Sequence, residues 1–293
     1  MPGLFVTGTG TGVGKTVLSA ALLAAMVAAG EPVRAHKPVV TGLDDPPGAW
    51  PPDHELLGAA ARMAPEEVAP LRYGPAVSPH LAAQLAGETL DPARLLARAR
   101  DDTDHPAQHV ALQRRQARLL ARARDDADHP AQHVALQRRQ ARLLVRARDD
   151  ADGTATTQGP APPGGSEAIH ADDRLTIVEG VGGLLVPLAP GYTVRDLAAE
   201  LGLPLLIAAP PGLGTINHTL LTIEAARSAG IDVRAVVLTP WSARPPVIEQ
   251  SNRDTIAQLG DVEVQCLPHL PGPDLTALAA AGARLPWRRW LAP

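Results

Sequence analysis

The order of apolar and polar positions changes its period several times along the chain. Short runs of consecutive apolar residues are typical of strands that are buried on both faces. We expect such strands at residues 4–8, 33–39, 175–180, 204–210 and 233–239. Longer stretches with helical spacing lie at residues 16–30, 194–202, 216–230 and 245–260. This alternation predicts an α/β fold with a mostly parallel sheet of about seven strands and helices on both faces.

A nearly perfect internal repeat interrupts the alternation. Residues 94–117 recur as residues 118–141 with a single change, and a third, partial copy begins at Arg142. Repeats of solenoid proteins diverge while they keep a spaced apolar skeleton, so near-identity indicates a recent duplication instead. We therefore interpret the repeat as a neutral insertion, with an interaction arm as the alternative.

The domain organisation follows from this repeat and from the segment behind it. Residues 153–173 are rich in Gly, Pro and small polar residues, which is typical of a flexible linker. We expect a single α/β domain over residues 1–293, with the tandem repeat inserted at 94–152 and the linker after it.

The composition argues against several classes of protein. The formal net charge is −4 and the isoelectric point is about 6.2, so a nucleic-acid-binding surface is not expected. There is no apolar run of about 18 residues and no basic segment before an apolar stretch at the start, so neither a membrane span nor a signal peptide is expected. The single cysteine, Cys266, cannot form an internal disulfide, which favours the cytoplasm.

The scarcity of lysine is informative about function. Of 27 basic residues only Lys15 and Lys37 are lysines, and the others are arginines. Where arginine is so strongly favoured, a remaining lysine indicates a position at which the planar guanidinium does not fit. A compact ammonium is required at tight phosphate or amine sites.

Lys15 belongs to a glycine-rich segment, GTGTGVGKT, that covers residues 8–16 between an expected strand and an expected helix. This is the context of a phosphate-binding loop, in which backbone N–H groups and the helix N-terminus surround a phosphate. Lys15 would reach the β- and γ-phosphates, and the Thr16 hydroxyl would coordinate Mg²⁺. The loop is one residue longer than the common GxxxxGK[ST] pattern, because position 9 is threonine.

Three further charged residues stand at places where strands or helices end or begin. Lys37 follows an expected strand, and Glu179 ends another one beside nearby glycines. Ligands of open α/β sheets bind at the carboxyl ends of the strands, so both residues are candidates for the site. Asp53 opens an expected helix, where it is either a second carboxylate of the site or an N-cap. Thr16 with two carboxylates would form a sparse oxygen site of the kind that Mg²⁺ prefers.

Several segments together resemble the ATP-dependent dethiobiotin synthetases of biotin biosynthesis, a family of P-loop NTPases. They are GTGTGVGKT, HKPVVTG, SPH, LTIVEGVGGLLVPL and GLGTINHTLLTIEAARSAGI, within residues 3–90 and 174–270. The resemblance implies a P-loop NTPase-like fold and a ligase that forms C–N bonds. Its reaction closes a ureido ring: 7,8-diaminononanoate, CO₂ and ATP give dethiobiotin, ADP and phosphate through a carbamate and a carbamic–phosphoric anhydride.

The resemblance also implies roles for individual residues. Lys37 and Lys15 would be catalytic, and Thr16, Asp53 and Glu179 would hold Mg²⁺. The nucleotide would contact Gly12, Val13, Gly14, Lys15, Thr16, Val17, Asp53, Glu179, Gly180, Val181, Gly182, Thr239, Pro268, His269 and Leu270. The diamine would contact Thr11, Thr41, Gly182 and Asn217, with Asn217 acting across the interface of a homodimer.

Two positions depart from the family pattern. Many members carry an acidic residue at the position of Gly12, and many carry an asparagine that reads adenine at the position of Thr239. The base preference is therefore open.

Other readings of the sequence are less well supported. A partitioning-type ATPase switch would carry a signature lysine where this chain has Gly10. A relative of the cobyrinate amidase-synthetases would need a nucleophilic cysteine in a glutaminase domain, whereas Cys266 lies late in an expected strand. A descendant without activity is the remaining alternative.

Overall fold

A parallel sheet of six strands lies at the centre of the computed structural model, which describes residues 1–46, 48–100 and 174–292. The strands are β1 (Gly3–Gly8), β2 (Val33–His36), β3 (Leu175–Glu179), β6 (Leu205–Ala209), β7 (Val233–Trp241) and β8 (Glu263–Pro268). They are arranged in the order β2-β3-β1-β6-β7-β8, and every neighbouring pair is parallel. The predicted α/β class is confirmed.

The main sheet of the described residues has six strands, close to the expected number of about seven. Two further strands, β4 (Pro187–Ala189) and β5 (Tyr192–Thr193), pair with each other as a separate antiparallel sheet. Both strands are short, and Pro187 lacks the N–H group that a central strand must donate. These residues therefore form a small hairpin beside the main sheet.

The strands of the main sheet are buried on both faces, as their continuous apolar runs predict. All residues of β1 and of β6 are buried. Phe5 of β1 lies in register between Val178 of β3 and Leu205 of β6. Burial of both faces requires helices on each side of the sheet.

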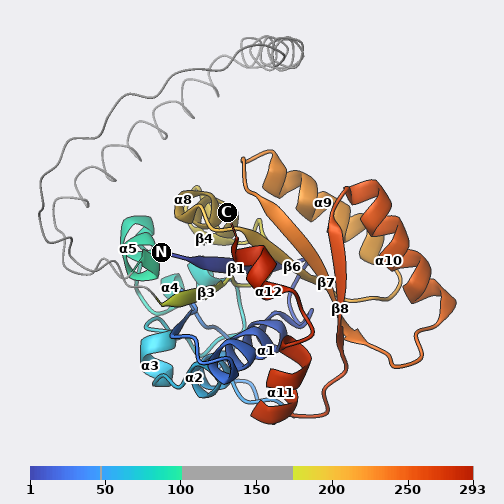
Figure 1. Ribbon diagram of the computed structural model, residues 1–293. Coiled ribbons are helices and arrows are strands. Elements are labelled where there is room, and N and C mark those ends of the chain that lie inside the picture. Colours follow the sequence, from blue (N-terminus) through green and yellow to red (C-terminus); the bar gives the residue numbers. More distant parts are fainter. Residues whose placement is uncertain (47, 101–173, 293) are drawn as a thin grey trace, which may run out of the picture. The chain divides into compact units, whose positions relative to one another are not determined.

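Helices cover the two faces, as Figure 1 shows. On one face α1 (Lys15–Ala28), α2 (Asp53–Ala61), α11 (Leu275–Gly282) and α12 (Trp287–Leu291) share one apolar core with the sheet. On the other face lie α8 (Val194–Leu201), α9 (Thr215–Arg227) and α10 (Val247–Gly260). The remaining described helices are α3 (Pro65–Val68), α4 (Pro79–Leu85) and α5 (Pro92–Arg100).

Helix α5 contains the first residues of the sequence repeat, and it packs into the same folded unit. Leu95, Leu96 and Ala99 are almost completely buried. The buried Arg34 guanidinium of β2 donates hydrogen bonds to the carbonyl oxygens of Arg98 and Ala99, at 2.6 and 2.8 Å. Residues 94–100 are thus part of the core, while the rest of the expected insertion and the linker lie outside the described residues.

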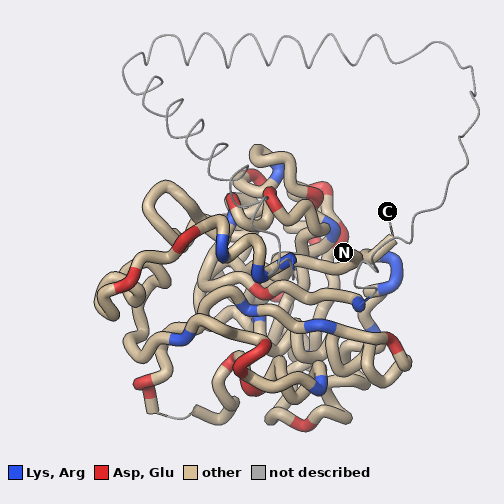
Figure 2. The backbone as a smooth tube through the Cα atoms, turned by 90° about the vertical axis from the view of Figure 1, so that its left-hand side faces the viewer, with Lys and Arg blue, Asp and Glu red and all other residues tan. Residues whose placement is uncertain are grey.

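The charged residues of the described chain are mixed in sign. Figure 2 shows Lys and Arg interspersed with Asp and Glu along the tube. This agrees with the small formal net charge of −4. No helix in the described ranges has the length and apolar character that a membrane crossing requires.

Candidate active site

The glycine-rich segment is a strand-to-helix loop, as predicted. β1 ends at Gly8 and α1 begins at Lys15. Gly14 immediately before the helix has a φ of 90°, and a Cβ atom there would lie only 2.6 Å from Cγ2 of Thr239. Only glycine combines this backbone conformation with so close a contact. The end of the loop is therefore held directly against the residue that precedes Pro240 in β7.

Lys15 folds back over this loop. Its side chain is 7% exposed, and its Nζ donates a hydrogen bond to the carbonyl oxygen of Gly10 at 2.8 Å. Burial and the nearby positive charge of Lys37 lower the pKa of Lys15 to about 8. A lysine that is buried, close to a second cation and held by a single carbonyl is prepared to bind an anion.

Lys37 lies between two carboxylates. Its Nζ is 2.6 Å from Oε1 of Glu179 and 2.9 Å from Oδ2 of Asp53. Lys37 follows β2, Glu179 ends the neighbouring strand β3, and Asp53 opens α2. Burial lowers the pKa of Lys37, but the attraction of Glu179 and Asp53 outweighs it and raises the pKa above its ordinary value. Lys37 is therefore a permanent cation near neutral pH.

The same interaction acts on Asp53. Burial raises the pKa of this carboxyl group, but the charge and the hydrogen bond of Lys37 outweigh burial and hold the pKa below its ordinary range. Asp53 is accordingly ionised, and its side chain remains 42% exposed toward the site.

The Thr16 hydroxyl lies within hydrogen-bond distance of both the Asp53 and the Glu179 carboxylate. Its Oγ1 is 2.8 Å from Oδ1 of Asp53 and 2.9 Å from Oε1 of Glu179, although a hydroxyl has only one proton to donate. In addition, Oε2 of Glu179 is fully buried and has no hydrogen-bond partner. Three converging oxygen ligands with an unsatisfied carboxylate oxygen fit a hard divalent cation such as Mg²⁺.

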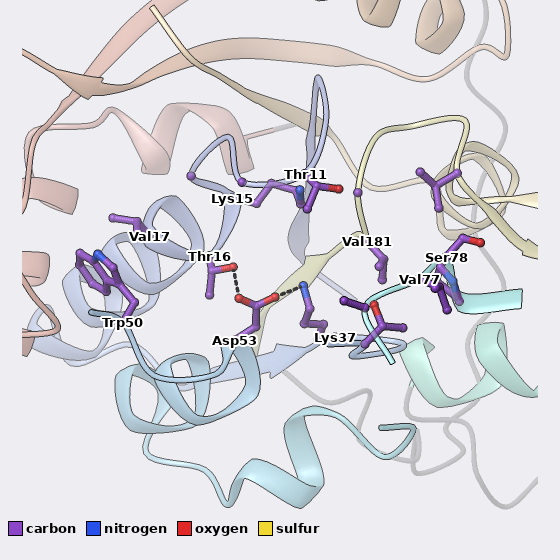
Figure 3. Close-up of a pocket in the computed structure, with 17 residues that line it drawn as sticks. Thr11, Lys15, Thr16, Val17, Lys37, Trp50, Asp53, Val77, Ser78 and Val181 are labelled. Atoms are coloured by element: carbon purple, nitrogen blue, oxygen red, sulfur yellow. Dashed lines mark hydrogen bonds and ion pairs between the residues drawn. The ribbon is translucent and has the colours of Figure 1, made fainter. Parts of the chain in front are cut away.

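Lys15, Thr16, Lys37 and Asp53 line a cavity of about 600 Å³, which we call the central cavity (Figure 3). In Figure 3 Thr16, Asp53 and Lys37 point toward one another, with Lys15 and Thr11 nearby. Eleven of the residues expected in the site line it: Thr11, Gly12, Gly14, Lys15, Thr16, Val17, Lys37, Thr41, Asp53, Val181 and Gly182. Groups from the phosphate loop, β2, α2 and the segment after β3 thus meet in one place.

Other expected residues lie around the central cavity rather than in its lining. Glu179 is buried beneath it, and the Gly180 carbonyl oxygen accepts a hydrogen bond from Lys37 at 3.4 Å. Val13 packs against Gly8 within the loop. Thr239 is 2% exposed and packs against Gly14.

The remaining expected residues are farther away. Pro268 and His269 line a second cavity of about 850 Å³, which we call the distal cavity, and Leu270 packs against the apolar core. Asn217 is exposed in the first turn of α9. Asn217 does not line the central cavity of the described chain. Its expected contact with the diamine would therefore require a second copy of the chain.

The structure also adds residues that the sequence reasoning missed. Trp50, Ala76, Val77, Ser78, Pro79 and Val186 line the central cavity. The SPH segment at residues 78–80 was part of the family resemblance and is the signal that points to Ser78 and Pro79. Trp50 lies in a proline-rich segment without a motif, so only the fold brings it to the cavity.

The chain is similar to several known proteins over most of its length. A family model described as an AAA domain matches residues 2–109 and 106–275. An "ATP-dependent dethiobiotin synthetase BioD" from Mycobacterium marinum is 34% identical over 87% of this chain and 82% of its own length. Proteins of the same name from Mycolicibacterium gilvum and Anaeromyxobacter dehalogenans are 33% and 35% identical, over 98% and 81% of this chain and 98% and 76% of their own lengths.

Proposed function

Since the chain belongs to the family of ATP-dependent dethiobiotin synthetases, we propose that it closes the ureido ring of dethiobiotin from 7,8-diaminononanoate, CO₂ and ATP. The family is one of ligases that form a C–N bond. ADP and phosphate are the other proposed products. One observation carries the proposal: both lysines of the chain meet a hydroxyl and two carboxylates at one cavity.

The proposed reaction has three steps that balance in atoms and charge. One amine of the substrate attacks CO₂ and loses a proton, which gives a carbamate. A carbamate oxygen then attacks the γ-phosphorus of ATP, and ADP leaves. Finally the second amine attacks the carbamoyl carbon, loses a proton and expels phosphate, which closes the five-membered urea.

Negative charge accumulates on the carbamate and on the transferred phosphoryl group, so the chain must supply positive charge more than covalent chemistry. Lys37 remains protonated because of its carboxylate neighbours. It therefore serves as a fixed cation and hydrogen-bond donor for the carbamate, not as a base. Lys15 leaves the Gly10 carbonyl oxygen and takes the phosphate oxygens.

Thr16, Asp53 and Glu179 are the residues that would hold Mg²⁺. This assignment is supported by the buried, unpartnered Oε2 of Glu179 and by the single proton that the Thr16 hydroxyl offers to two carboxylates. When bound, the metal neutralises charge on the phosphates. Thr41 and Thr11, which line the same cavity, would position the diamine.

A homodimer is part of the proposal. Leu213, Leu185 and Leu221 are 92%, 56% and 56% exposed. Leu185 and Leu221 line a groove of about 480 Å³ together with Thr11 of the phosphate loop. Exposed apolar side chains beside a site support an interface with another protein chain. Asn217, with the N-terminus of α9, would hold the substrate carboxylate of the other protomer.

A cytoplasmic location also belongs to the proposal. The chain has a single cysteine, Cys266, and this composition fits a reducing compartment.

The proposed function is tested by the release of phosphate from ATP with bicarbonate and Mg²⁺, in the presence and absence of 7,8-diaminononanoate. We expect release that depends on the diamine and equals the dethiobiotin formed. An Arg72→Met variant, altered at an exposed ion pair with Glu66 and outside the lining of the central cavity, should keep the rate. Release that does not respond to the diamine would contradict the proposal and favour a nucleotide-driven switch.

A further inference from the structure

Lys37 contacts the same carboxylates that the proposed function assigns to a divalent cation. Its Nζ is 2.6 Å from Oε1 of Glu179 and 2.9 Å from Oδ2 of Asp53. The Thr16 hydroxyl is 2.8 Å from Oδ1 of Asp53 and 2.9 Å from Oε1 of Glu179. Three of the four carboxylate oxygens thus already contact a donor, and Oε2 of Glu179 is the one without a partner in the described chain.

The ammonium of Lys37 balances the charge of this group. Lys37 is 2% exposed and Glu179 is 0% exposed, so water screens their interaction little. Buried charges in proteins are paired with an opposite charge or coordinate a metal. In the structure the first of these applies, because the ammonium lies in direct contact with both carboxylates. Lys37 is therefore the internal counter-ion of the site.

Lys37 and a divalent cation would compete for these oxygens. Mg²⁺ takes carboxylate and hydroxyl oxygens as close ligands, whereas an ammonium on the same oxygens repels it. The Asp53 side chain is 42% exposed and lines the central cavity, so this carboxylate is accessible. Binding of a metal by Asp53 and Glu179 therefore requires that the ammonium of Lys37 moves away from them.

Lys37 has another acceptor that remains available during such a movement. The Gly180 carbonyl oxygen lies 3.4 Å from its Nζ. Figure 3 shows Thr16, Asp53 and Lys37 in a row, with Lys37 at one end of it. Lysine carries its ammonium on a flexible stem, so Nζ can turn into the central cavity while it stays close to Gly180. The ammonium would then face the space that the carbamate is proposed to occupy.

We propose that Lys37 is an internal counter-ion that gives up Asp53 and Glu179 when a divalent cation binds, and that this exchange releases its ammonium into the central cavity. Lys37 thereby becomes available to the carbamate only after the cation is in place. This inference rests on the proposed function, which supplies the role of the metal and of the carbamate. It adds a conformational device in which one cation replaces another on the same carboxylates.

The test measures the binding of Mn²⁺ alone, without ATP or the diamine, by electron paramagnetic resonance of the free ion. Lys37→Met removes the competing cation and leaves both carboxylates in place. It should bind Mn²⁺ at least about ten-fold more tightly than the unaltered protein, because the repulsion between the ammonium and the metal is lost. An unchanged or weaker affinity of Lys37→Met for Mn²⁺ would overturn the proposal.

Two control variants separate direct competition from a general effect of charge. Lys15→Met removes the other lysine of the central cavity, whose Nζ contacts the Gly10 carbonyl oxygen rather than a carboxylate. It should tighten Mn²⁺ binding by less than about three-fold, since its charge acts only through space. Arg72→Met removes an exposed cation paired with Glu66 and should leave the affinity unchanged. A gain in Lys15→Met as large as that in Lys37→Met would overturn direct displacement.

Thermal unfolding with Mn²⁺ or with EDTA keeps the test decisive if Lys37→Met folds poorly. A ligand that binds only the folded state raises Tm, so millimolar Mn²⁺ should raise the Tm of Lys37→Met more than that of the unaltered protein. A variant that folds with Mn²⁺ but not with EDTA would support the exchange, and one that stays unfolded in both would overturn it. Because neither measurement uses ATP or the diamine, a lack of turnover would contradict only the proposed function.

Discussion

Replacement of Lys37 by methionine tests how the buried charges of the site are balanced. Methionine is of similar length but carries no charge, so Glu179 would lose the ammonium that lies 2.6 Å from its Oε1. Glu179 is 0% exposed and would keep only the Thr16 hydroxyl as a donor. Removal of one partner from a buried ion pair costs about 3–5 kcal/mol of unfolding free energy.

The destabilisation of Lys37→Met should therefore be about 3–5 kcal/mol, or about 6–20 °C in Tm. The assay is urea unfolding of the nucleotide-free protein at pH 7, followed by circular dichroism. Arg72→Met serves as the matched control, because it breaks an exposed pair with Glu66 and should leave the unfolding midpoint near that of the unaltered protein. If Lys37→Met unfolds like this control, the assignment of Lys37 as the counter-charge of Glu179 is refuted.

Four further predictions concern catalysis, binding and the insertion. Lys37→Arg keeps the charge, but its larger guanidinium does not fit between Asp53 and Glu179, so turnover should fall about a hundred-fold or more; near-normal turnover would contradict the argument from lysine scarcity. Because the pKa of Lys15 is lowered to about 8, nucleotide binding above pH 8 should take up a proton and weaken as the pH rises. Calorimetry in buffers of different ionisation enthalpy measures this proton uptake, and binding without proton uptake at pH 9 would contradict the role of Lys15. Deletion of residues 118–165 should leave soluble, active protein, because loop closure changes by only about 0.6 kcal/mol per doubling of length; an insoluble or inactive product would mean that the segment packs on the core or on a partner. Thr239 cannot form the two hydrogen bonds that an asparagine side chain makes with adenine. The kcat/KM with CTP or GTP should therefore lie within about ten-fold of that with ATP. A preference for ATP above a hundred-fold would show that backbone groups recognise adenine.

The sequence by itself determined the fold class and most of the chemistry of the site. Continuous apolar runs require burial on both faces, which only a helix-covered parallel sheet provides. The glycine pattern of residues 8–16 fixes a loop whose backbone and Lys15 suit a phosphate, and the scarcity of lysine separates Lys15 and Lys37 from the other cations. The strand and loop signals are local, since each depends on residue types within one turn or one strand, whereas the scarcity of lysine is a property of the whole composition.

The tertiary structure decided which of these groups meet. Lys37 and Glu179 are 142 positions apart, and they touch because β2 and β3 are neighbours in the sheet order. Trp50 reaches the central cavity without any motif, and α5 is part of the core although the sequence marks it as the start of a repeat. Thr239 of β7 packs against Gly14 of the phosphate loop. Local periodicity indicates that strands and helices exist, but the order of strands depends on how apolar surface is buried between segments far apart in the chain, and that order places the side chains at the carboxyl edge of the sheet.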